Sequence, residues 1–479
     1  MPLDDISTEN AMQSLLSKQK AAQLKEGAPT AAARIDRLDR AINLLVENSD
    51  ALNDAVSTDF GHRSKDVTAF ADTATSIAQL KFAKKHLRQW MKAERRSVEF
   101  PFGLLGASAR VEFQPKGVVG VIAPWNFPVG MVFGPLAGVI AAGNRAMIKP
   151  SEFTENTSGL MKKIVADAFD ETEVAVVTGG PEIGAAFTKL PFDHIVFTGS
   201  GSIARHIMRA ASENLVPLTL ELGGKSPAIL GRSANFEKAA TRVMHGKVLN
   251  AGQICLAPDY VLAPNEKIDE FVGHAKSAVE TMMPSGFKEN DDYTSIINQR
   301  HYERLQGYLD DAREKGGELV EINPKNEDFS QQPQRMMPPT LVLNPTDDMA
   351  VMQDEIFGPI LPVKSYEKID NAIDYVNAHD HPLGLYYFGA DENEQSQVLS
   401  STLSGGATIN DVIFHVAQED LPFGGVGPSG MGCYHGRDGF QEFSHKKSIY
   451  KQTNSELIKM IRPPYGDMFR KQIKGRIKN

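Results

Sequence analysis

From Gly117 onward, short β-branched runs alternate with longer segments of helical periodicity. The first five runs are Val118–Ile122, Ala146–Ile148, Val174–Val177, His194–Thr198 and Leu218–Leu220. Strands that alternate with helices are typical of a doubly wound α/β fold with a mostly parallel sheet. After Pro227 the alternation starts again, with runs at Ala228–Leu230, Tyr260–Leu262, Glu355–Val363 and Gly406–Asn410. The sequence therefore predicts two α/β units, and 479 residues are enough for both.

The segment Val118–Ala142 contains no charged residue and resembles a membrane span in hydropathy. It is interrupted, however, by Pro124, Pro128 and Pro135 and by four glycines. Prolines and glycines at this density interrupt a single helix. We therefore expect a strand, a turn and a buried helix here, and no integral membrane anchor.

The amino-acid composition indicates which kinds of partner the protein binds and in which cellular compartment it works. The formal net charge is -9, which does not favour a nucleic-acid partner. Two cysteines cannot form a disulfide framework, and their low number fits a reducing compartment. The first residues, Met1 to Ile6, carry acids where a signal peptide needs a basic and then an apolar run. We expect a cytoplasmic protein.

A glycine turn lies between a strand and a helix at His194–Ala204, with the spacing G-x-G-x-x-A at Gly199, Gly201 and Ala204. In this context backbone N–H groups and the helix N-terminus can meet a pyrophosphate, although an ordinary turn has the same composition. The acidic residue that binds ribose in such folds lies about twenty positions further on, close to Glu221.

Cys255 and Glu221 are candidates for covalent chemistry on a carbonyl. A thiolate can attack the carbonyl carbon while a carboxylate moves protons. Both residues also have ordinary interpretations, because most free cysteines are small buried apolar side chains and Glu221 could form a salt bridge with Lys225. At this level Glu221 is a ribose ligand, a general base or a structural residue.

Two further segments carry polar side chains in turns. Lys149 and Glu152 follow a strand and could reach one ribose, although most lysines at strand ends are simply solvated. Trp125 and Asn126 lie in the proline-rich turn Ala123–Pro128, which could aim the Asn126 amide at a developing oxyanion or could serve packing alone.

In combination these segments resemble the NAD(P)-dependent aldehyde dehydrogenase superfamily. Its motifs occur here in the same order, as Pro124-Trp-Asn-Phe-Pro128, Lys149-Pro-Ser-Glu152, Phe197-Thr-Gly-Ser200, Leu220-Glu-Leu-Gly-Gly-Lys225, Gly252-Gln-Ile-Cys255 and Glu355-Ile-Phe-Gly-Pro359. The match runs from about Arg34 to the C-terminus. Segments such as Phe423–Gly432 and Tyr434–Gly436 resemble the class-3-type branch, and Phe60–Ser64 and Val412–Pro422 resemble bacterial coniferyl aldehyde dehydrogenases.

The resemblance implies a role for each candidate residue. Cys255 would be the nucleophile that forms a thiohemiacetal and then a thioester, Glu221 the general base, and Asn126 part of the oxyanion hole. The implied cofactor is NAD, with NADP possible, and no metal is implied. The residues implied to bind the cofactor are Trp125, Lys149, Glu152, Gly199, Ser200, Glu355 and Phe357. Ala204 departs from the glycine usual in the family, and its methyl group would tighten helix packing or shift the pyrophosphate.

The implied fold is aldehyde dehydrogenase-like α/β, with a Rossmann-type NAD-binding domain, an α/β catalytic domain and a small β bridging element. We assign residues 1–97 and 116–222 to the NAD-binding domain, 223–425 to the catalytic domain, and 98–115 and 426–479 to the bridging segment and tail. In the bridging element, the segment near Val98–Gln114 would pair with Ser444–Thr453. An exposed bridging strand invites pairing with a second subunit, so we expect a homodimer.

The expected substrate is an aldehyde in an apolar tunnel lined by Phe127, Met131, Ile254 and Leu256. Coniferaldehyde is the leading candidate, and a medium-chain aliphatic aldehyde is the alternative. Three other readings stay open: transfer of the thioester to coenzyme A, a cysteine hydrolase, and a non-catalytic role on an enzyme fold. The basic tail after Arg462 is expected to be a surface helix, with contact to an anionic membrane as the weaker alternative.

Overall fold

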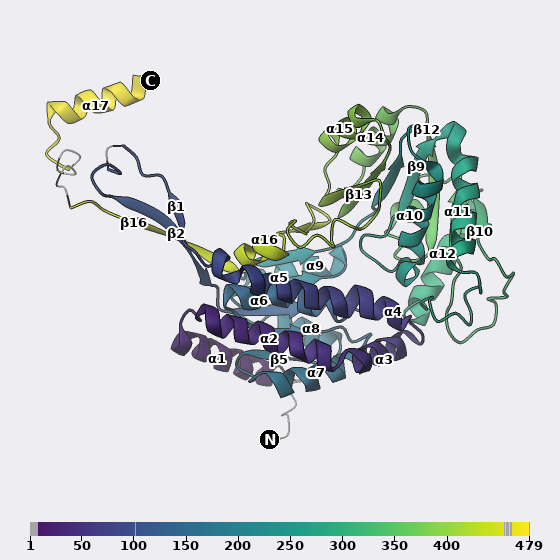
Figure 1. Ribbon diagram of the computed structural model, residues 1–479, viewed down its shortest axis with the longest axis horizontal. Coiled ribbons are helices and arrows are strands. Elements are labelled where there is room, and N and C mark those ends of the chain that lie inside the picture. The colour runs from purple at the N-terminus through teal and green to yellow at the C-terminus, as the bar shows by residue number, and fades with distance from the viewer. Residues whose placement is uncertain (1–7, 101, 455, 457–458, 460–461, 479) are drawn as a thin grey trace.

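The computed structural model describes residues 8–478 except 101, 455, 457, 458, 460 and 461. The first residues, Met1 to Ile6, on which the argument against a signal peptide rests, lie outside this range. Two α/β units, each built on its own sheet, lie side by side, and a narrow arm of three strands extends from one of them (Figure 1).

The first sheet has six strands in the order β15-β7-β6-β3-β4-β5. Its parallel strands are β3 (Val118–Ile122), β4 (Arg145–Lys149), β5 (Val174–Val176), β6 (His194–Thr198) and β7 (Leu218–Glu221). They confirm the five strands predicted before Pro227. The short β15 (Gly430–Met431) pairs with β7 in the antiparallel sense, so one strand of this sheet comes from the segment that we assigned to the bridging part.

Helices surround the six-stranded sheet (Figure 1). Those that precede it in the chain are α1 (Glu9–Glu26), α2 (Ala31–Glu47), α3 (Ser49–Phe60), α4 (Lys65–Thr68), the π-helical turn η1 (Ala69–Ala74) and α5 (Thr75–Trp90). Those that connect its strands are α6 (Gly130–Ala142), α7 (Glu155–Ala168), α8 (Pro181–Thr188) and α9 (Gly201–Ser212).

The uncharged segment Val118–Ala142 forms β3, a turn and the almost fully buried helix α6, as predicted. Side chains of α6 pack between α5 and the sheet in one apolar cluster, which explains the lack of charge without a membrane. Among the described residues, no helix has both the length and the apolar composition needed to cross a bilayer.

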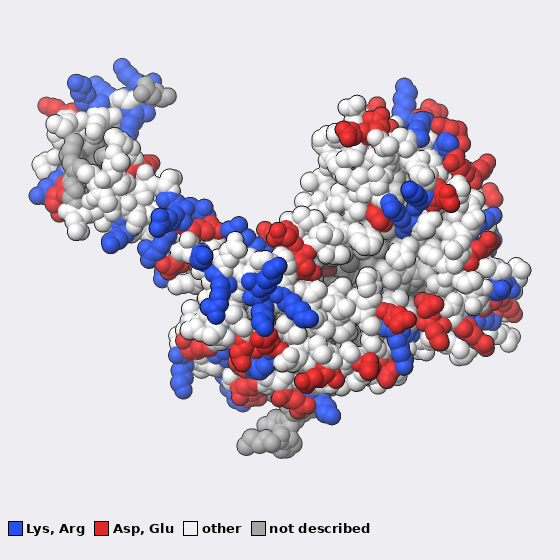
Figure 2. Space-filling model, in the orientation of Figure 1, with Lys and Arg blue, Asp and Glu red and all other residues white. Residues whose placement is uncertain are grey.

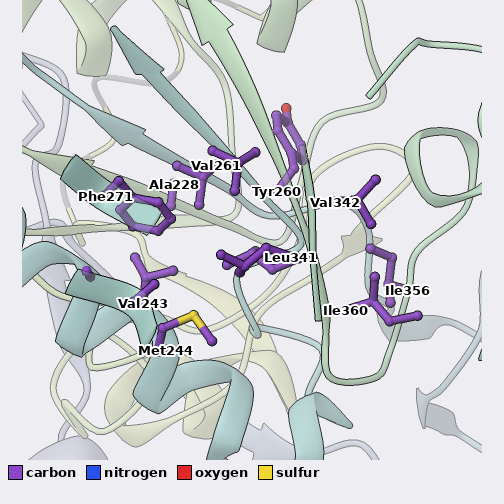
Figure 3. Close-up of a cluster of buried hydrophobic side chains, with 14 of the residues drawn as sticks. Ala228, Val243, Met244, Tyr260, Val261, Phe271, Leu341, Val342, Ile356 and Ile360 are labelled. Carbon is purple, nitrogen blue, oxygen red and sulfur yellow. The ribbon is translucent and has the colours of Figure 1, made fainter. Parts of the chain in front are cut away.

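The second sheet has seven strands in the order β10-β11-β12-β9-β8-β13-β14. The strands are β8 (Pro227–Leu230), β9 (Tyr260–Pro264), β10 (Glu318–Glu321), β11 (Thr340–Leu343), β12 (Ile360–Tyr366), β13 (Gly384–Phe388) and β14 (Gly406–Ile409). Its helical elements are α10 (Phe236–Val248), η2 (Leu249–Gly252), η3 (Asn265–Lys267), α11 (Ile268–Met282), α12 (Gln299–Glu314), α13 (Ala350–Gln353), α14 (Ile369–Asn377) and α15 (Glu392–Ser401). Apolar side chains of the sheet and its helices form the core in Figure 3.

The second unit confirms the predicted restart of the α/β pattern, but β10, β11 and β13 were not predicted, and one predicted strand begins too early. The run Glu355–Val363 is not one strand, because β12 begins only at Ile360. Phe357 has a φ of 49°, in the left-handed region, which interrupts an extended strand before Ile360. The residues before Ile360 form a loop that reaches toward the other unit.

The arm contains β1 (Glu94–Arg96), β2 (Ser108–Pro115) and β16 (Ser444–Lys451) in the order β1-β2-β16. The predicted pairing with the C-terminal segment is confirmed from Ser108 onward, where Ser108 to Pro115 run antiparallel to Ser444–Lys451. The preceding residues form hydrogen-bonded turns. The short α16 (Gly436–Glu442) precedes β16, and α17 (Asp467–Lys478) lies beyond the end of the arm (Figure 1).

Candidate active site

The candidate residues of the first sheet lie at the carboxyl ends of its parallel strands. Glu221 is the last residue of β7, Thr198 of β6 and Lys149 of β4, and the turn Ala123–Pro128 follows β3 directly. Since these strands are parallel, all four ends lie along one edge of the sheet. This edge is where open α/β sheets bind ligands.

Cys255 is presented by a strained turn between α10 and β9. Asn250, Ala251 and Gly252 have φ values of 51°, 50° and 69°, so three consecutive residues are left-handed. A side chain at Gly252 would collide with the Gly358 carbonyl oxygen, because its Cβ would lie 2.4 Å from that atom. Left-handed residues other than glycine cost free energy and cluster at functional sites.

The side chain of Gln253 fixes this turn through three hydrogen bonds. Its Nε2 donates to the carbonyl oxygens of Asn250 and Ser295 at 3.0 Å each, and its Oε1 accepts from the Ile297 N–H at 3.0 Å. The amide is fully buried, so all three bonds are shielded from water. The position of Cys255 is therefore set by buried hydrogen bonds two residues before it.

Glu221 and Cys255 lie close enough to shift each other's pKa. Burial raises the pKa of Glu221 to about 8, against a smaller lowering by the Cys255 side chain. Burial and then the charge of Glu221 raise the pKa of the Cys255 thiol well above its usual value. Neither Glu221 carboxylate oxygen has a hydrogen-bond partner among the described residues, although the side chain is 1% exposed. An unpartnered buried carboxyl group beside a thiol is suited to accepting its proton.

The salt bridge considered between Glu221 and Lys225 does not form. Lys225 instead binds Asp259 and donates to the carbonyl oxygens of Val351 at 2.6 Å and Asp354 at 2.8 Å. Among the described residues Glu221 therefore has no salt bridge with Lys225, and Lys225 instead holds the loop that carries Glu355.

Asn126 reaches the same place from the first sheet. Its Nδ2 donates to the carbonyl oxygen of Gln253 at 3.1 Å, two residues before Cys255. Its own carbonyl oxygen accepts from Asn250 Nδ2 at 3.2 Å, so the two turns are bonded in both directions. An amide with a second N–H, this close to the nucleophile, is suited to stabilising an oxyanion there.

A buried ion pair holds the Asn126 turn from its other side. Arg63 Nη1 donates to the Asn126 carbonyl oxygen at 2.7 Å, and Nη2 lies 3.1 Å from Asp72 Oδ2. Asp72 Oδ1 accepts from the N–H groups of Val129 at 3.1 Å and Gly130 at 2.6 Å, at the start of α6. Both side chains are fully buried, and Arg63 Nε has no partner in the described structure.

Tyr434 is a site residue to which our sequence analysis gave no role. Its phenol is 2% exposed and unpartnered in the described structure. Burial raises its pKa well above the usual value, and the charges of Glu221 and Cys255 raise it further, which places the hydroxyl near both groups. The motif Tyr434–Gly436 marked this segment but not its function.

Glu355 and Phe357 enter the site from the loop before β12. Gly223, two residues after Glu221, leaves room for the Glu355 carboxyl group, because a Cβ at this position would lie 2.3 Å from Glu355 Oε1. Burial, followed by the charge of Asp259, raises the pKa of Glu355 to about 8. The Phe357 ring lies edge-on to Trp125, with ring centroids 5.4 Å apart.

The remaining predicted residues lie further along the strand ends. Lys149 is buried, donates to the Pro150 carbonyl oxygen at 2.8 Å and lies 3.7 Å from Glu152. Beside Glu152 is a surface hollow of about 310 Å³ whose floor includes Gly179 and Gly180. In the glycine turn, the Gly199 N–H donates to the Glu221 carbonyl oxygen at 3.1 Å, and exposed Ser200 is the N-cap of α9.

The methyl group of Ala204 packs inside the protein. It is 1% exposed and belongs to an apolar cluster with Phe197, Ile207 and Leu220. Of the two effects that we considered for this departure from the family pattern, the structure supports tighter packing of α9 on the sheet.

Apolar side chains surround the candidate nucleophile. Phe127, Ile254 and Leu256 are buried in one cluster, and Met131 and Cys255 pack against it. The side chains that raise the pKa of the Cys255 thiol are carboxylates, Glu221 and Glu355, so the base that the site offers to the thiol is a carboxylate.

Comparison with known proteins gives consistent matches along the chain. The model of the aldehyde dehydrogenase family matches residues 5–449. A probable coniferyl aldehyde dehydrogenase from Caulobacter vibrioides is 60% identical over 98% of this chain and 97% of its own length. A coniferyl aldehyde dehydrogenase from a Pseudomonas species is 53% identical, over 95% and 94%. The solved structure described as the substrate-bound state of Staphylococcus aureus AldH has a TM-score of 0.91 and 35% identity, and the match covers 97% of this chain and 99% of that one.

Proposed function

The chain belongs to the aldehyde dehydrogenase family, whose members use NAD(P), and we propose that it oxidises an aromatic aldehyde of the coniferaldehyde type to the carboxylic acid. Membership confirms the superfamily and the cofactor class that the six motifs predicted. The single observation that supports the chemistry is the buried, unpartnered Glu221 carboxyl group beside the Cys255 thiol.

In the proposed first step, Cys255 adds to the substrate carbonyl. Glu221 accepts the thiol proton, the sulfur forms a bond to the carbonyl carbon, and the carbonyl oxygen takes the negative charge. A base with a pKa near 8 can take this proton at neutral to mildly alkaline pH. The Asn126 amide and the Cys255 main-chain N–H would stabilise the oxyanion.

The second half of the proposed reaction releases the carboxylic acid. When bound, NAD(P)+ accepts the hydride that leaves the substrate carbon, and a thioester on Cys255 remains. Glu221 first releases the thiol proton to solvent and then takes a proton from water, and the water oxygen attacks the thioester carbon. The carbon–sulfur bond breaks, and the Cys255 thiolate takes a proton back from Glu221, which restores both groups. The presence of this base favours hydrolysis over transfer to coenzyme A.

The residues of the first sheet fit a dinucleotide. The hollow lined by Glu152, Gly179 and Gly180 leaves room for a flat group beside its glycines, and Glu152, with Lys149 3.7 Å from it, would meet a ribose. A carboxylate there favours NAD because it repels a 2′-phosphate. Gly199 and Ser200 would meet the pyrophosphate at the start of α9, and Glu355, Phe357 and Trp125 would hold the nicotinamide end.

The apolar cluster around Cys255 supports the choice of substrate. Phe127, Met131, Ile254 and Leu256 would line a tunnel that favours a ring or a hydrocarbon chain over a charged aldehyde. The coniferyl aldehyde dehydrogenases among the relatives favour the ring.

The test is a direct comparison of aldehydes. The purified enzyme is given NAD with coniferaldehyde, benzaldehyde or a medium-chain aliphatic aldehyde, and the acid formed is quantified by chromatography, because coniferaldehyde itself absorbs in the near ultraviolet. The highest kcat/KM for coniferaldehyde would support the proposal. A preference for the aliphatic aldehyde would keep the mechanism and replace the substrate, and no acid from any of the three would contradict both.

We also propose that the enzyme is a cytoplasmic homodimer. Strand β16 is an edge of the arm sheet, and most of its residues are exposed in the single chain. An unpaired edge of this kind is a site for pairing with a second copy. Mass photometry of the purified protein would measure its assembly state.

A further inference from the structure

Helix α17 is a basic amphipathic helix, and its Phe469 ring stacks on Tyr465 just before it, with ring centroids 4.7 Å apart. None of its residues is buried in the described structure, and Met468 and Ile477 are 68% and 79% exposed. It lies beyond the tip of the arm, away from both sheets (Figure 1). The catalytic and cofactor residues proposed above make no use of it.

The sequence of α17 separates apolar from cationic residues. Phe469, Ile473 and Ile477 recur every four residues and so form one stripe along the helix. Arg470, Lys474 and Lys478 follow each of them by one position and form a parallel cationic stripe. The two stripes lie next to each other, so a surface that receives one also meets the other.

The charge of α17 differs in sign from that of the chain. The helix carries one acid, Asp467, and five cations, namely Arg470, Lys471, Lys474, Arg476 and Lys478. The whole chain, in contrast, has a formal net charge of -9. Figure 2 shows blue side chains at this end of the molecule, together with a few red ones. A local positive charge on an acidic protein indicates an anionic partner.

We propose that α17 lies in the interface of an anionic lipid membrane, with its apolar stripe among the acyl chains and its cations at the headgroups. Helices with such a stripe and a lysine-rich polar face bind at membrane surfaces without crossing them. A helix of twelve residues without tertiary contacts is marginal in water, so contact with a surface would also stabilise it. A second copy of the chain is the weaker candidate, because lysines are depleted from protein interfaces and α17 has three.

This placement would bring the enzyme to the membrane without an anchor that spans it. An apolar aldehyde partitions into a bilayer, so a docked enzyme would meet a higher local concentration of such a substrate. The docking itself depends only on α17 and is independent of the proposed reaction.

The test uses the full chain and flotation with lipid vesicles. Vesicles of phosphatidylcholine are compared with vesicles in which about one third of the lipid is phosphatidylglycerol. We expect binding to the anionic vesicles only, reduced about tenfold or more when salt rises from about 0.1 M to about 0.5 M.

Two variants and two matched controls assign the binding to α17. Ile473→Glu breaks the apolar stripe, and Leu403→Glu places the same change at a half-exposed leucine outside α17. Lys474→Glu reverses a cation, and Lys276→Glu does the same on the exposed face of α11. Both α17 variants should lose at least about tenfold in bound fraction, while the controls bind like the wild type. Equal thermal midpoints would show that all four fold.

Three outcomes would overturn the proposal. The first is equal binding of the wild type to neutral and anionic vesicles, and the second is binding that survives in both α17 variants. The third is absence of vesicle binding together with a smaller assembly in Ile473→Glu by mass photometry, which would assign α17 to contact with a second copy.

Discussion

Replacement of Arg63 by methionine should lower kcat far more than the loss of another buried arginine of the same domain. Arg63→Met removes the donor that holds the Asn126 carbonyl oxygen at 2.7 Å and leaves Asp72 buried without its cation. Loss of one partner of a buried ion pair costs about 3–5 kcal/mol of folding free energy. The variant should therefore unfold at lower denaturant concentration and still be folded at low temperature.

The effect on catalysis comes through Asn126. With Arg63 gone, the Asn126 carbonyl oxygen keeps only the donor Asn250 Nδ2 of its two described donors, so the Asn126 backbone is no longer held from both sides. A displacement of about 1 Å at a catalytic group costs roughly 100-fold in rate, and removal of an oxyanion donor costs about 100- to 1,000-fold. We expect kcat to fall by about 100-fold, or about 2.7 kcal/mol, with little change in KM for NAD.

The matched control is Arg34→Met. Arg34 is also buried and also binds backbone carbonyl oxygens, those of Pro29 at 3.0 Å and Ala141 at 2.8 Å, at the far end of α6. It should lose comparable stability and keep kcat within about threefold when assayed as folded protein.

The double variant Arg63→Met/Asp72→Asn separates positioning from stability. It leaves no lone buried charge, so we expect it to recover part of the folding free energy but not kcat. Steady-state kinetics and urea unfolding are measured on all the variants. A wild-type kcat in Arg63→Met, with the same stability loss as Arg34→Met, would refute the positioning role.

Four other predictions concern the groups that react or bind. Cys255→Ala should abolish acid formation and leave NAD affinity within about twofold, as measured by fluorescence titration; residual turnover would remove Cys255 from the mechanism. Because burial raises the pKa of Glu221 to about 8, kcat should rise with pH up to that value, and a flat profile from about pH 6 to 9 would contradict its role as base. The same shift means that the folded state holds a proton that the unfolded state loses above pH 4.5, so Glu221 removes stability as pH rises from about 4.5 to 8. The free energy of unfolding of Glu221→Gln, relative to that of the wild type, should therefore increase by at least about 1 kcal/mol from pH 5 to pH 9, as measured by urea unfolding. Glu152→Gln should lower the preference for NAD over NADP several-fold, whereas Glu155→Gln, in the same hollow, should not; equal ratios would place the ribose elsewhere.

Strands β3, β5 and β6 of the first sheet were predictable because each is a short, largely buried run with β-branched residues between helices. The second sheet was harder to read. Strand β13 pairs with both β8 and β14 but reads Gly-Leu-Tyr-Tyr-Phe, with a glycine at its start and no β-branched residue. Strand β11 follows two prolines, which indicate a loop. In both cases pairing within the sheet overrides the local signal.

The site divides in a similar way. Cys255, Glu221 and Asn126 lie in short motifs whose residue types suit carbonyl chemistry, so the sequence could single them out. The partners that fix them are distant in the chain and chemically ordinary. Arg63 precedes Asn126 by more than sixty residues, and nothing in its surroundings indicates that it binds a backbone carbonyl oxygen. The partners of a buried polar group depend on the fold.

The position of Glu221 explains why two sheets are needed for one reaction. It is the last residue of β7 in the first sheet, and β8 of the second begins at Pro227, so five residues separate the base from the unit that carries Cys255. Two of those five residues hold the connection in place. Lys225 binds Asp259 and the loop that carries Glu355, and the Ser226 carbonyl oxygen accepts from the Asp259 N–H at 2.8 Å. Asp259 Oδ1 in turn accepts from the Ile356 N–H at 2.9 Å. The distance between the proposed base and the proposed nucleophile thus depends on the crossing between the sheets, so we expect a change at Lys225 or Asp259 to lower kcat although neither residue is assigned to the substrate.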